Sequence, residues 1–408
     1  MNPRLGLILF AGALLPRLAY CALSLRLRGV PPTDVFDPWD TLSASVLRGE
    51  GLRCDLFGLS WWSHRPPVFP LLVAGVRFLF GTGAWPIYLM NSVLGAATAV
   101  VVWRTGARLF GERAGFWAGV AFALWPFSVV WTAGVQPEVL GALLLACCVW
   151  ALTAERMWLT GLFAALLALT RSNYLLIAPL FTLWLVFARQ WRRALPMLAV
   201  WALTLLPWGI RNTVVHGQWM LTSSDGAMAF VIYNDREMIR RQLTGESEHV
   251  HPMNLTYGRI FEDLKKMPEP EQTRAMYRAG MENIKQVPAQ YARVVGQRFW
   301  LLWNPVPDTG GGATRLLTGI PLVVAHLCAL WGFVMLWRQQ GQRMFAVLLL
   351  GLAAFATSVI LVRGVSRYKA TVEPAVVLLA IAGARDAVSR LARRRVAQVR
   401  PLDSVTAA

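Results

Sequence analysis

Long apolar runs separated by short polar connections dominate the sequence. A straight helix needs roughly 20 mostly apolar residues to cross a bilayer, so runs that approach this length mark candidate spans. Ten segments qualify, near residues 5–25, 84–109, 114–133, 139–153, 157–170, 174–188, 194–208, 313–337, 344–362 and 371–384. The shorter ones would extend into flanking polar residues or lie where the bilayer is thin. The pattern therefore predicts an all-α polytopic membrane protein with about ten transmembrane helices.

Two longer polar segments interrupt the apolar runs. Residues 26–83 are rich in Pro, Gly, Trp and acids, and the prolines of the short apolar stretch 66–80 suit the start of a juxtamembrane helix. Residues 209–312 begin with turn-forming residues and then alternate polar and apolar faces, which predicts helices over about 254–267 and 271–303. The predicted divisions are a transmembrane module 1–208 that includes the loop 26–83, a helical segment 209–312, C-terminal transmembrane helices 313–384 and a basic tail 385–408.

The arginines place these segments relative to the membrane. Of the 408 residues 56% are hydrophobic and 15% charged, yet the net charge is +18, and 36 of the 40 basic residues are Arg. The arginines recur in short clusters between the apolar runs, as the positive-inside rule expects of cytoplasmic connections, so they do not indicate a nucleic-acid partner. With both termini in the cytoplasm, the densest clusters lie inside, and segments 26–83 and 209–312 are exofacial. Tyr20 and Arg17 are unsuited to a cleavage site, so the first run is predicted to remain as a helix.

The cysteines and histidines give little support for a disulfide or a metal site. All cysteines except Cys54 fall inside apolar runs, so no disulfide is predicted. The histidines, including the "EHVH" stretch at 248–251, match no strong ligand spacing. No cofactor is implied, and a divalent metal is the weaker interpretation.

Three carboxylates crowd the first exofacial loop in "TDVFDPWDTL", at Asp34, Asp37 and Asp40. An aspartate near a membrane surface serves as a general base, a metal ligand or a helix cap. For each residue alone the cap and the functional role are equally good interpretations. The cluster favours function, because the loop returns to the membrane through "WWSHR" at 61–65 and can form one wall of a cavity.

Arginines on the same face offer a second kind of chemistry. In "SHRPPVFP" the Pro66-Pro67 step would fix Arg65 at the membrane surface. Such an arginine is either simply solvated or a phosphate ligand, since the guanidinium fork matches phosphate oxygens. Three more arginines have predicted exofacial positions: Arg171, Arg211 and Arg367, the last beside Tyr368. Four arginines on the face that the positive-inside rule disfavours indicate a phosphate-binding surface.

Five stretches together carry a resemblance to a known family. They are "RPPVFPLLVAGVRFLFG" (65–81), "FGERAGFWAGVAFALWPFSVVWTAGVQPEVL" (110–140), "LALTRSNYLL" (167–176), "PWGIRNTVVHGQWMLTSSDGAMAFVIYN" (207–234) and "SRYKATVEPAVVLLAIAG" (366–383). In this order they resemble the GT-C membrane glycosyltransferases, in the glycosyltransferase family 39-like branch of protein O-mannosyltransferases and the bacterial lipid A aminoarabinose transferase. The resemblance spans nearly the whole chain and rests on the succession of the stretches.

The resemblance implies a polyprenyl-phosphate-linked sugar donor, an exofacial active site and a catalytic aspartate in the first large loop. The catalytic role carries best onto Asp37, although Asp34 and Asp40 share the loop at intervals of three. The basic residue before Pro-Pro is Arg65, and the arginine of "PWGIRN" is Arg211, which makes both donor phosphate ligands by resemblance.

Four further residues are predicted to belong to the site. Arg367 is predicted to join the donor phosphate site, and Glu138 in "QPE" either orients the acceptor or caps the next helix. Tyr368 and His64 are predicted to contact the acceptor or to be structural. One aspartate and fixed cations suffice for inversion in a single displacement, without the paired carboxylates of a retaining hydrolase.

Two other functions fit the same pattern. A polysaccharide polymerase or ligase would use the same lipid-phosphate chemistry on an oligosaccharide, and a lipid or solute transporter would also be polytopic. The predicted partners are the lipid-linked donor, a lipid, glycan or protein acceptor, and the bilayer of a bacterial inner membrane. Neither the sugar nor the acceptor follows from the sequence.

Overall fold

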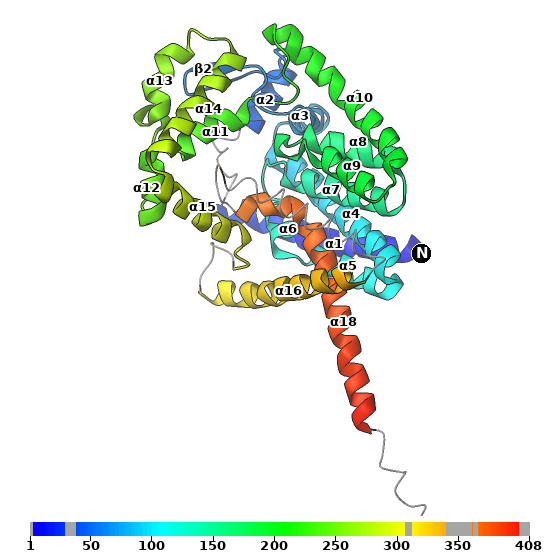
Figure 1. Cartoon of the computed structure of the whole chain (residues 1–408). Coiled ribbons are helices and arrows are strands. Elements are labelled where there is room, and N and C mark those ends of the chain that lie inside the picture. Colours follow the sequence, from blue (N-terminus) through cyan, green and yellow to red (C-terminus); the bar gives the residue numbers. More distant parts are fainter. Residues whose placement is uncertain (1–2, 29–37, 307–311, 340–360, 362–365, 400–408) are drawn as a thin grey trace, which may run out of the picture.

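The computed structural model describes residues 3–28, 38–306, 312–339, 361 and 366–399, and most of these residues are helical (Figure 1). The prediction of a helical protein is confirmed for them. Asp34 and Asp37 lie outside the described residues, as does nearly all of the predicted span 344–362.

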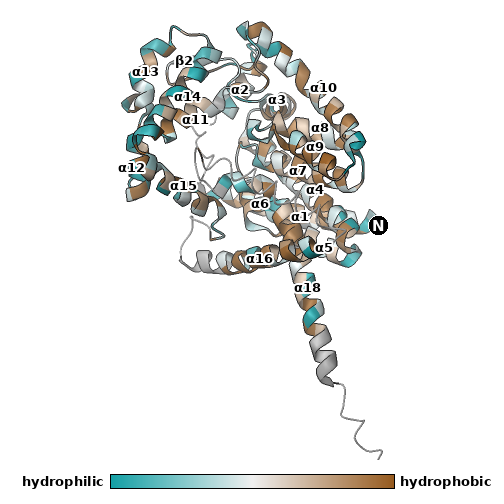
Figure 2. Ribbon diagram, in the orientation of Figure 1, coloured by the Kyte–Doolittle hydropathy of each residue, from teal (hydrophilic) through white to brown (hydrophobic). Residues whose placement is uncertain are grey.

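Apolar helices form the larger part of the structure. In the described part of the chain, the four helices long and apolar enough to cross a membrane are α1 (Pro3–Arg28), α4 (Ala84–Phe110), α10 (Trp191–His216) and α16 (Gly312–Arg338). The helices between and after them are α2 (Trp39–Leu47), α3 (Val68–Phe80), α5 (Glu112–Ala123), α6 (Pro126–Val130), α7 (Glu138–Thr153), α8 (Met157–Ala168), α9 (Ile177–Phe187) and α18 (Glu373–Val399). Their buried faces share one apolar core. These helices also carry most of the brown, hydrophobic residues in Figure 2. The predicted apolar segments in the described chain thus form helices, while ten crossings stay a prediction.

The predicted span 114–133 is broken between α5 and α6. Pro126 lacks an N–H and disfavours helical geometry in the residue before it, so the ladder of hydrogen bonds stops there. Arg17 of α1 is fully buried and binds the open end of α5, with its Nη1 donating to the carbonyl of Ala123 at 3.0 Å. Its Nη2 also donates to the hydroxyl of Ser128 at 2.9 Å. The arginine therefore satisfies polar groups that a bilayer would leave without partners.

The helix α10 continues beyond the apolar run 194–208 to His216. Arg211 consequently lies in the last turns of this helix, and the prediction of turn-forming residues from 209 is wrong. Asn212 explains part of the difference, because its amide donates to the carbonyl of Thr222 at 3.1 Å and so supports a polar helix end.

Five helices form a separate group that we call the polar lobe, residues 225–303. They are α11 (Asp225–Tyr233), α12 (Arg236–Thr244), α13 (Thr256–Leu264), α14 (Glu269–Gln286) and α15 (Pro288–Trp303). The lobe carries many of the teal, hydrophilic residues in Figure 2. The helices predicted over 254–267 and 271–303 are confirmed, the second one divided at Pro288. The helices α11 and α12 were not predicted from the sequence.

A short hairpin in the first loop connects the lobe to the bundle. Its strands β1 (Cys54–Leu56) and β2 (Leu59–Trp61) pair antiparallel. The hydroxyl of Tyr257 in the lobe donates to the carbonyl of Phe57 at the turn, at 3.3 Å. Burial raises the pKa of the Cys54 thiol to about 12, so this cysteine stays protonated at neutral pH. All five cysteines are free thiols.

The two last described long helices cross at a pair of glycines. A Cβ on Gly332 of α16 would lie 2.0 Å from the carbonyl oxygen of Leu379, and one on Gly383 of α18 would lie 2.0 Å from that of Cys328. The glycines therefore permit a backbone contact that any larger residue would block. Beyond this crossing α18 projects away from the body of the molecule (Figure 1).

Candidate functional site

The chain segments that carry the predicted arginines meet at one place. The N–H of Val68 donates to the carbonyl of Leu169 at 3.0 Å, so the chain just after Arg65 runs beside the chain that follows α8. Arg211, at the end of α10, donates from Nη1 to the carbonyl of Trp62 at 2.8 Å. The fold thus gathers the first loop, the end of α8 and the end of α10.

One group of charges lies around Glu138, the first residue of α7. We call Glu138, Arg171, Arg367 and Tyr368 the Glu138 cluster. The Nη1 of Arg171 donates to Glu138 Oε1 at 2.7 Å, and the Nε of Arg367 lies 3.1 Å from the same oxygen. The Cζ atoms of the two arginines lie 4.9 and 5.3 Å from the centre of the Tyr368 ring. Glu138 is buried, while each arginine side chain keeps 12% of its surface exposed. Two cations on one carboxylate leave an excess positive charge.

Close packing brings the 3-10 helix η4 (Ser366–Val372), which carries Arg367, against α7. A Cβ on Gly141 would lie 3.1 Å from the Thr371 hydroxyl, so a larger residue would press η4 away from α7. The buried Lys369 fixes η4 from the other side, because its Nζ donates to the carbonyl of Asn304 at 2.6 Å. The cluster is therefore assembled from elements more than 200 residues apart in sequence.

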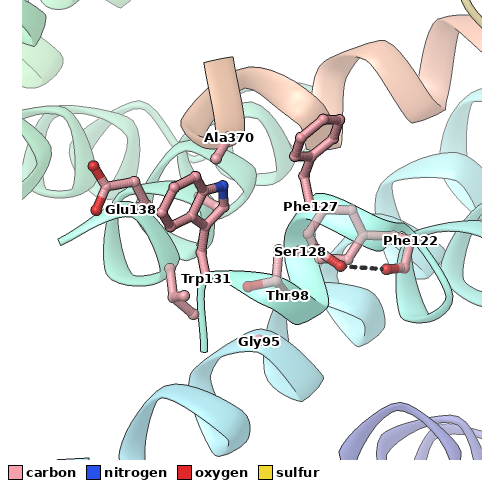
Figure 3. A pocket seen from close by; sticks show the side chains of 10 residues that line it. Gly95, Thr98, Phe122, Phe127, Ser128, Trp131, Glu138 and Ala370 are labelled. Atoms are coloured by element: carbon pink, nitrogen blue, oxygen red, sulfur yellow. Dashed lines mark hydrogen bonds between the residues drawn. The ribbon is translucent and has the colours of Figure 1, made fainter. Parts of the chain in front are cut away.

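A pocket adjoins the Glu138 cluster (Figure 3). Its lining is mostly apolar and aromatic, with Glu138, Ser128 and Thr98 as its polar side chains, and the indole of Trp131 stands beside Glu138. The second carboxylate oxygen of Glu138 has no hydrogen-bond partner among the described residues. A buried carboxylate oxygen without a partner can accept a hydrogen bond from an incoming hydroxyl or amine.

Arg65 lies on an aromatic platform. Its Cζ is 5.2 Å from the centre of the Trp39 ring, and Trp39 packs edge-on against Phe69 at 5.3 Å. The ring of Trp39 is buried, and the two prolines after Arg65 lead directly into α3. A cation held over an indole keeps a defined orientation.

Arg211 is held by several hydrogen bonds and by an aromatic ring. Its Nη1 also donates to the hydroxyl of Ser63 at 2.8 Å and to Oδ1 of Asn212 at 3.0 Å. Its Cζ lies 4.8 Å from the centre of the Trp208 ring. These three hydrogen bonds all use Nη1 as the donor, so they do not engage Nε or Nη2.

The one described aspartate of the acidic loop, Asp40, forms an ion pair with Arg77 of α3. Arg77 also donates to the hydroxyl of Ser43 in α2, at 2.6 Å. The pair therefore joins α2 to α3. His64 is buried with its ring centre 5.4 Å from that of Trp61, which is a packing contact.

Sequence reasoning missed several residues of this region. Arg77, Asn212 and Glu269, which accepts hydrogen bonds from the 62–63 backbone, carry no local signal that separates them from ordinary helix-surface residues. Many of their partners are distant in sequence, up to 207 residues away for Glu269 and Trp62. In the described part of the chain, no three His, Cys, Asp or Glu side chains group as metal ligands.

Comparison with known proteins adds a family match over part of the chain and a fold. Residues 64–210 match the family described as dolichyl-phosphate-mannose-protein mannosyltransferase. No curated protein matches the sequence.

Several solved structures are similar. The archaeal oligosaccharyltransferase AglB from Archaeoglobus fulgidus, in complex with an inhibitory peptide and a dolichol-phosphate, has a TM-score of 0.56 at 14% identity, over 99% of this chain and 52% of its own. The oligosaccharyltransferase of the same archaeon in the apo form has a TM-score of 0.54 at 15% identity, over 96% of this chain and 52% of its own. ArnT from Cupriavidus metallidurans bound to undecaprenyl phosphate has a TM-score of 0.45 at 15% identity, over 93% of this chain and 77% of its own.

The chain spans about half the length of the archaeal enzymes that it matches. The predicted resemblance is confirmed at the level of the fold, and the family match covers residues 64–210. The protein has the GT-C fold of membrane glycosyltransferases, and over residues 64–210 it is similar to the dolichyl-phosphate-mannose-protein mannosyltransferases.

Proposed function

We propose that this protein is an inverting glycosyltransferase that moves a sugar from a polyprenyl-phosphate-linked donor to an acceptor on the exofacial side of the membrane. The observation that carries the proposal is the meeting of three short segments, each with an arginine: Arg65 after the hairpin, Arg171 after α8 and Arg211 at the end of α10. Arg367 lies near the same end of α8, because it shares an oxygen of Glu138 with Arg171. A phosphate on a lipid carrier needs such fixed cations at the surface of an apolar bundle.

The proposed donor ligands are Arg65, Arg211 and Arg367. Charge grows on the phosphate as the glycosidic bond breaks, so cations that are already oriented stabilise the transition state more than the ground state. The aromatic platform under Arg65 supports this role, because it restricts the guanidinium before the donor arrives.

The proposed general base is Asp37. An acceptor oxygen or nitrogen attacks the anomeric carbon, its proton passes to the carboxylate, and the carbon–oxygen bond breaks with the electron pair leaving on the phosphate. Asp34 is the alternative base. Asp40 is the weaker candidate because its carboxylate already pairs with Arg77.

The proposed acceptor site is the pocket beside Glu138. The second oxygen of Glu138, which has no hydrogen-bond partner among the described residues, would accept a hydrogen bond from an acceptor hydroxyl or amine, while the two arginines hold the carboxylate in place. Tyr368 is proposed to fix the arginines, since its ring contacts both guanidinium groups. The packing of His64 against Trp61 supports a structural role for that histidine.

Cysteine labelling tests the proposed topology of ten crossings with both termini in the cytoplasm. In a protein without its native cysteines, Glu262→Cys in the polar lobe should react with an impermeant maleimide in intact cells. Ser389→Cys in α18 should react only after the membrane is opened. Labelling of both positions from the same side would overturn the proposed topology.

The activity itself is tested with purified protein and a panel of radiolabelled polyprenyl-phosphate sugars. Transfer to an acceptor with inversion at the anomeric carbon is the expected result. Turnover of lipid-linked oligosaccharides alone would instead assign a polymerase or ligase. Movement of intact lipid across proteoliposomes without bond cleavage would assign a transporter.

A further inference from the structure

Glu269 of the polar lobe binds the backbone of the first loop. It is the first residue of α14, and only 4% of its side-chain surface is exposed. Its Oε2 accepts the N–H of Trp62 at 2.8 Å, and its Oε1 accepts the N–H of Ser63 at 3.2 Å. The hydroxyl of Ser224 donates to the same Oε1 at 2.6 Å. One buried carboxylate therefore holds two successive peptide groups, three residues before Arg65.

Ser63 has its remaining polar atoms bound by other elements. Its carbonyl accepts the N–H of Ser224 at 3.0 Å. Its hydroxyl donates to Asn212 Oδ1 at 2.9 Å and lies 2.8 Å from Nε2 of His216. The Nη1 of Arg211 donates to the same hydroxyl. We call this network the Ser63 hub: Trp62, Ser63, Arg211, Asn212, His216, Ser224 and Glu269.

The hub connects two of the proposed donor ligands to the lobe. Arg211 binds the carbonyl of Trp62 and the hydroxyl of Ser63, while Glu269 binds the N–H groups of the same two residues. Arg65 follows two residues later and is fixed on its other side by Trp39. The position of both arginines thus depends on where the lobe holds the 62–63 dipeptide.

We propose that Glu269 is a positioning residue that sets Arg65 and Arg211 for the phosphate of the lipid-linked donor. The inference rests on the proposed function in so far as these arginines bind that phosphate. Glu269 contacts neither reacting atom. The carboxylate suits this positioning role because it accepts hydrogen bonds from several N–H and O–H donors at once, which no neutral side chain of the same length does.

The substitution Glu269→Gln removes part of this acceptor capacity. The amide keeps one oxygen but presents an NH₂ group toward backbone N–H donors, which leaves at least one buried donor without a partner. Glu269→Asp keeps both acceptor oxygens but withdraws them by one methylene. We therefore expect Gln to disrupt the loop and Asp to retain part of its order.

The test combines three measurements on the purified full chain. Hydrogen exchange reports on the amides of Trp62 and Ser63 in peptides covering 59–68, equilibrium binding of polyprenyl phosphate reports on the arginines, and transfer assays give kcat and the donor KM. Glu269→Gln should accelerate exchange in that peptide, weaken lipid-phosphate binding about tenfold or more, and lower kcat/KM by up to about 100-fold, as expected for a displaced binding group. Glu269→Asp should restore part of each.

A matched control is Asp235→Asn. Asp235 is another buried lobe carboxylate that accepts a backbone N–H, from Thr256 at 2.8 Å, but it lies outside the hub. The control should lower the thermal midpoint without changing exchange in 59–68 or lipid-phosphate affinity. If Glu269→Gln fails to fold, Ser224→Ala, which removes one donor to Glu269, decides by the same three readouts.

The outcomes separate this inference from the proposed function. Unchanged exchange in 59–68, or faster exchange with unchanged lipid-phosphate affinity, would overturn the role of Glu269. Weaker affinity in the Asp235→Asn control to the same degree would overturn it too. A wild-type protein that binds polyprenyl phosphate but transfers no sugar would refute the proposed transferase activity, while the shift in lipid affinity caused by Glu269→Gln would still support the positioning role.

Discussion

The Glu138 cluster and the Ser63 hub are both built on one buried carboxylate, but they differ in charge balance. In the Glu138 cluster two partly exposed arginines share one carboxylate oxygen, and the other oxygen has no hydrogen-bond partner among the described residues. In the Ser63 hub one arginine and one glutamate bind the same dipeptide, and the glutamate is occupied by backbone N–H groups. The first arrangement keeps charge available for a ligand, whereas the second uses charge to order a loop.

This difference divides the proposed arginines by role. Arg367 belongs to the cluster with excess positive charge, and Arg211 belongs to the hub, where part of its guanidinium already serves the loop. Arg65 lies over the ring of Trp39, and the hub holds the start of its segment. Variants of Arg211 should therefore affect both binding and loop order.

The largest expected effect lies outside both networks. Asp37→Asn should lower turnover about 100-fold or more while leaving lipid-phosphate binding intact. The measurement is kcat beside an equilibrium binding curve for polyprenyl phosphate.

Asp40→Asn is the control for this prediction. It removes the ion pair with Arg77 and should reduce thermal stability more than turnover per folded molecule. If Asp40→Asn or Asp34→Asn is the variant that binds the lipid but does not turn over, the base has been misassigned within the loop.

The next effect concerns the stability of the Glu138 cluster. Glu138→Ala leaves two arginines without their shared carboxylate, and loss of one partner from a buried ion pair costs about 3 to 5 kcal/mol. Chemical unfolding in detergent should show a loss of this order. A loss below about 1 kcal/mol, the range of surface pairs, would mean that the arginines are already solvated and that the contrast with the hub is wrong.

Much of the fold was predictable, because apolar runs and amphipathic periodicity report local structure. The helices α4, α7 and α13 fall close to their predicted ranges. The polar continuation of α10 to His216 was not predictable, since it depends on contacts of Asn212 with the segment after the helix. Likewise, Arg77 and Glu269 acquire their partners only through tertiary packing, and no spacing rule relates them to Asp40 or Ser63.

A smaller effect is expected from changing Arg65 conservatively. Arg65→Lys keeps a point charge but loses the fork that matches phosphate, so part of the activity should remain, whereas Arg65→Ala should lose most of it. Steady-state kinetics with a lipid-linked donor should rank turnover per folded molecule in the order wild type, Arg65→Lys, Arg65→Ala. Equal turnover of wild type and Arg65→Ala with lower expression would reduce Arg65 to a membrane anchor.

The smallest expected effect is a pH dependence in the polar lobe. Hydrogen bonds from Arg240 and Arg241 lower the pKa of Glu237 to about 2. Because the folded pKa lies below the unfolded value, the stabilisation is complete above about pH 4.5 and is lost as the pH falls toward 2. Unfolding midpoints between pH 5 and pH 2 should converge for wild type and Glu237→Gln. If solvent fully screens these exposed ion pairs, the midpoints of the two proteins would instead change with pH in parallel.

Equilibrium binding of a radiolabelled polyprenyl-phosphate sugar to the purified protein tests most directly whether the gathered arginines form a donor site. We expect saturable binding that unlabelled polyprenyl phosphate displaces, and a loss of about tenfold or more for Arg65→Ala, as for a charged hydrogen bond. The double variant with Arg211→Ala should lose less than the two single losses combined, because both residues serve one phosphate. Saturable binding that neither variant weakens, or that free sugar displaces as well as the lipid phosphate does, would contradict a phosphate site at these arginines.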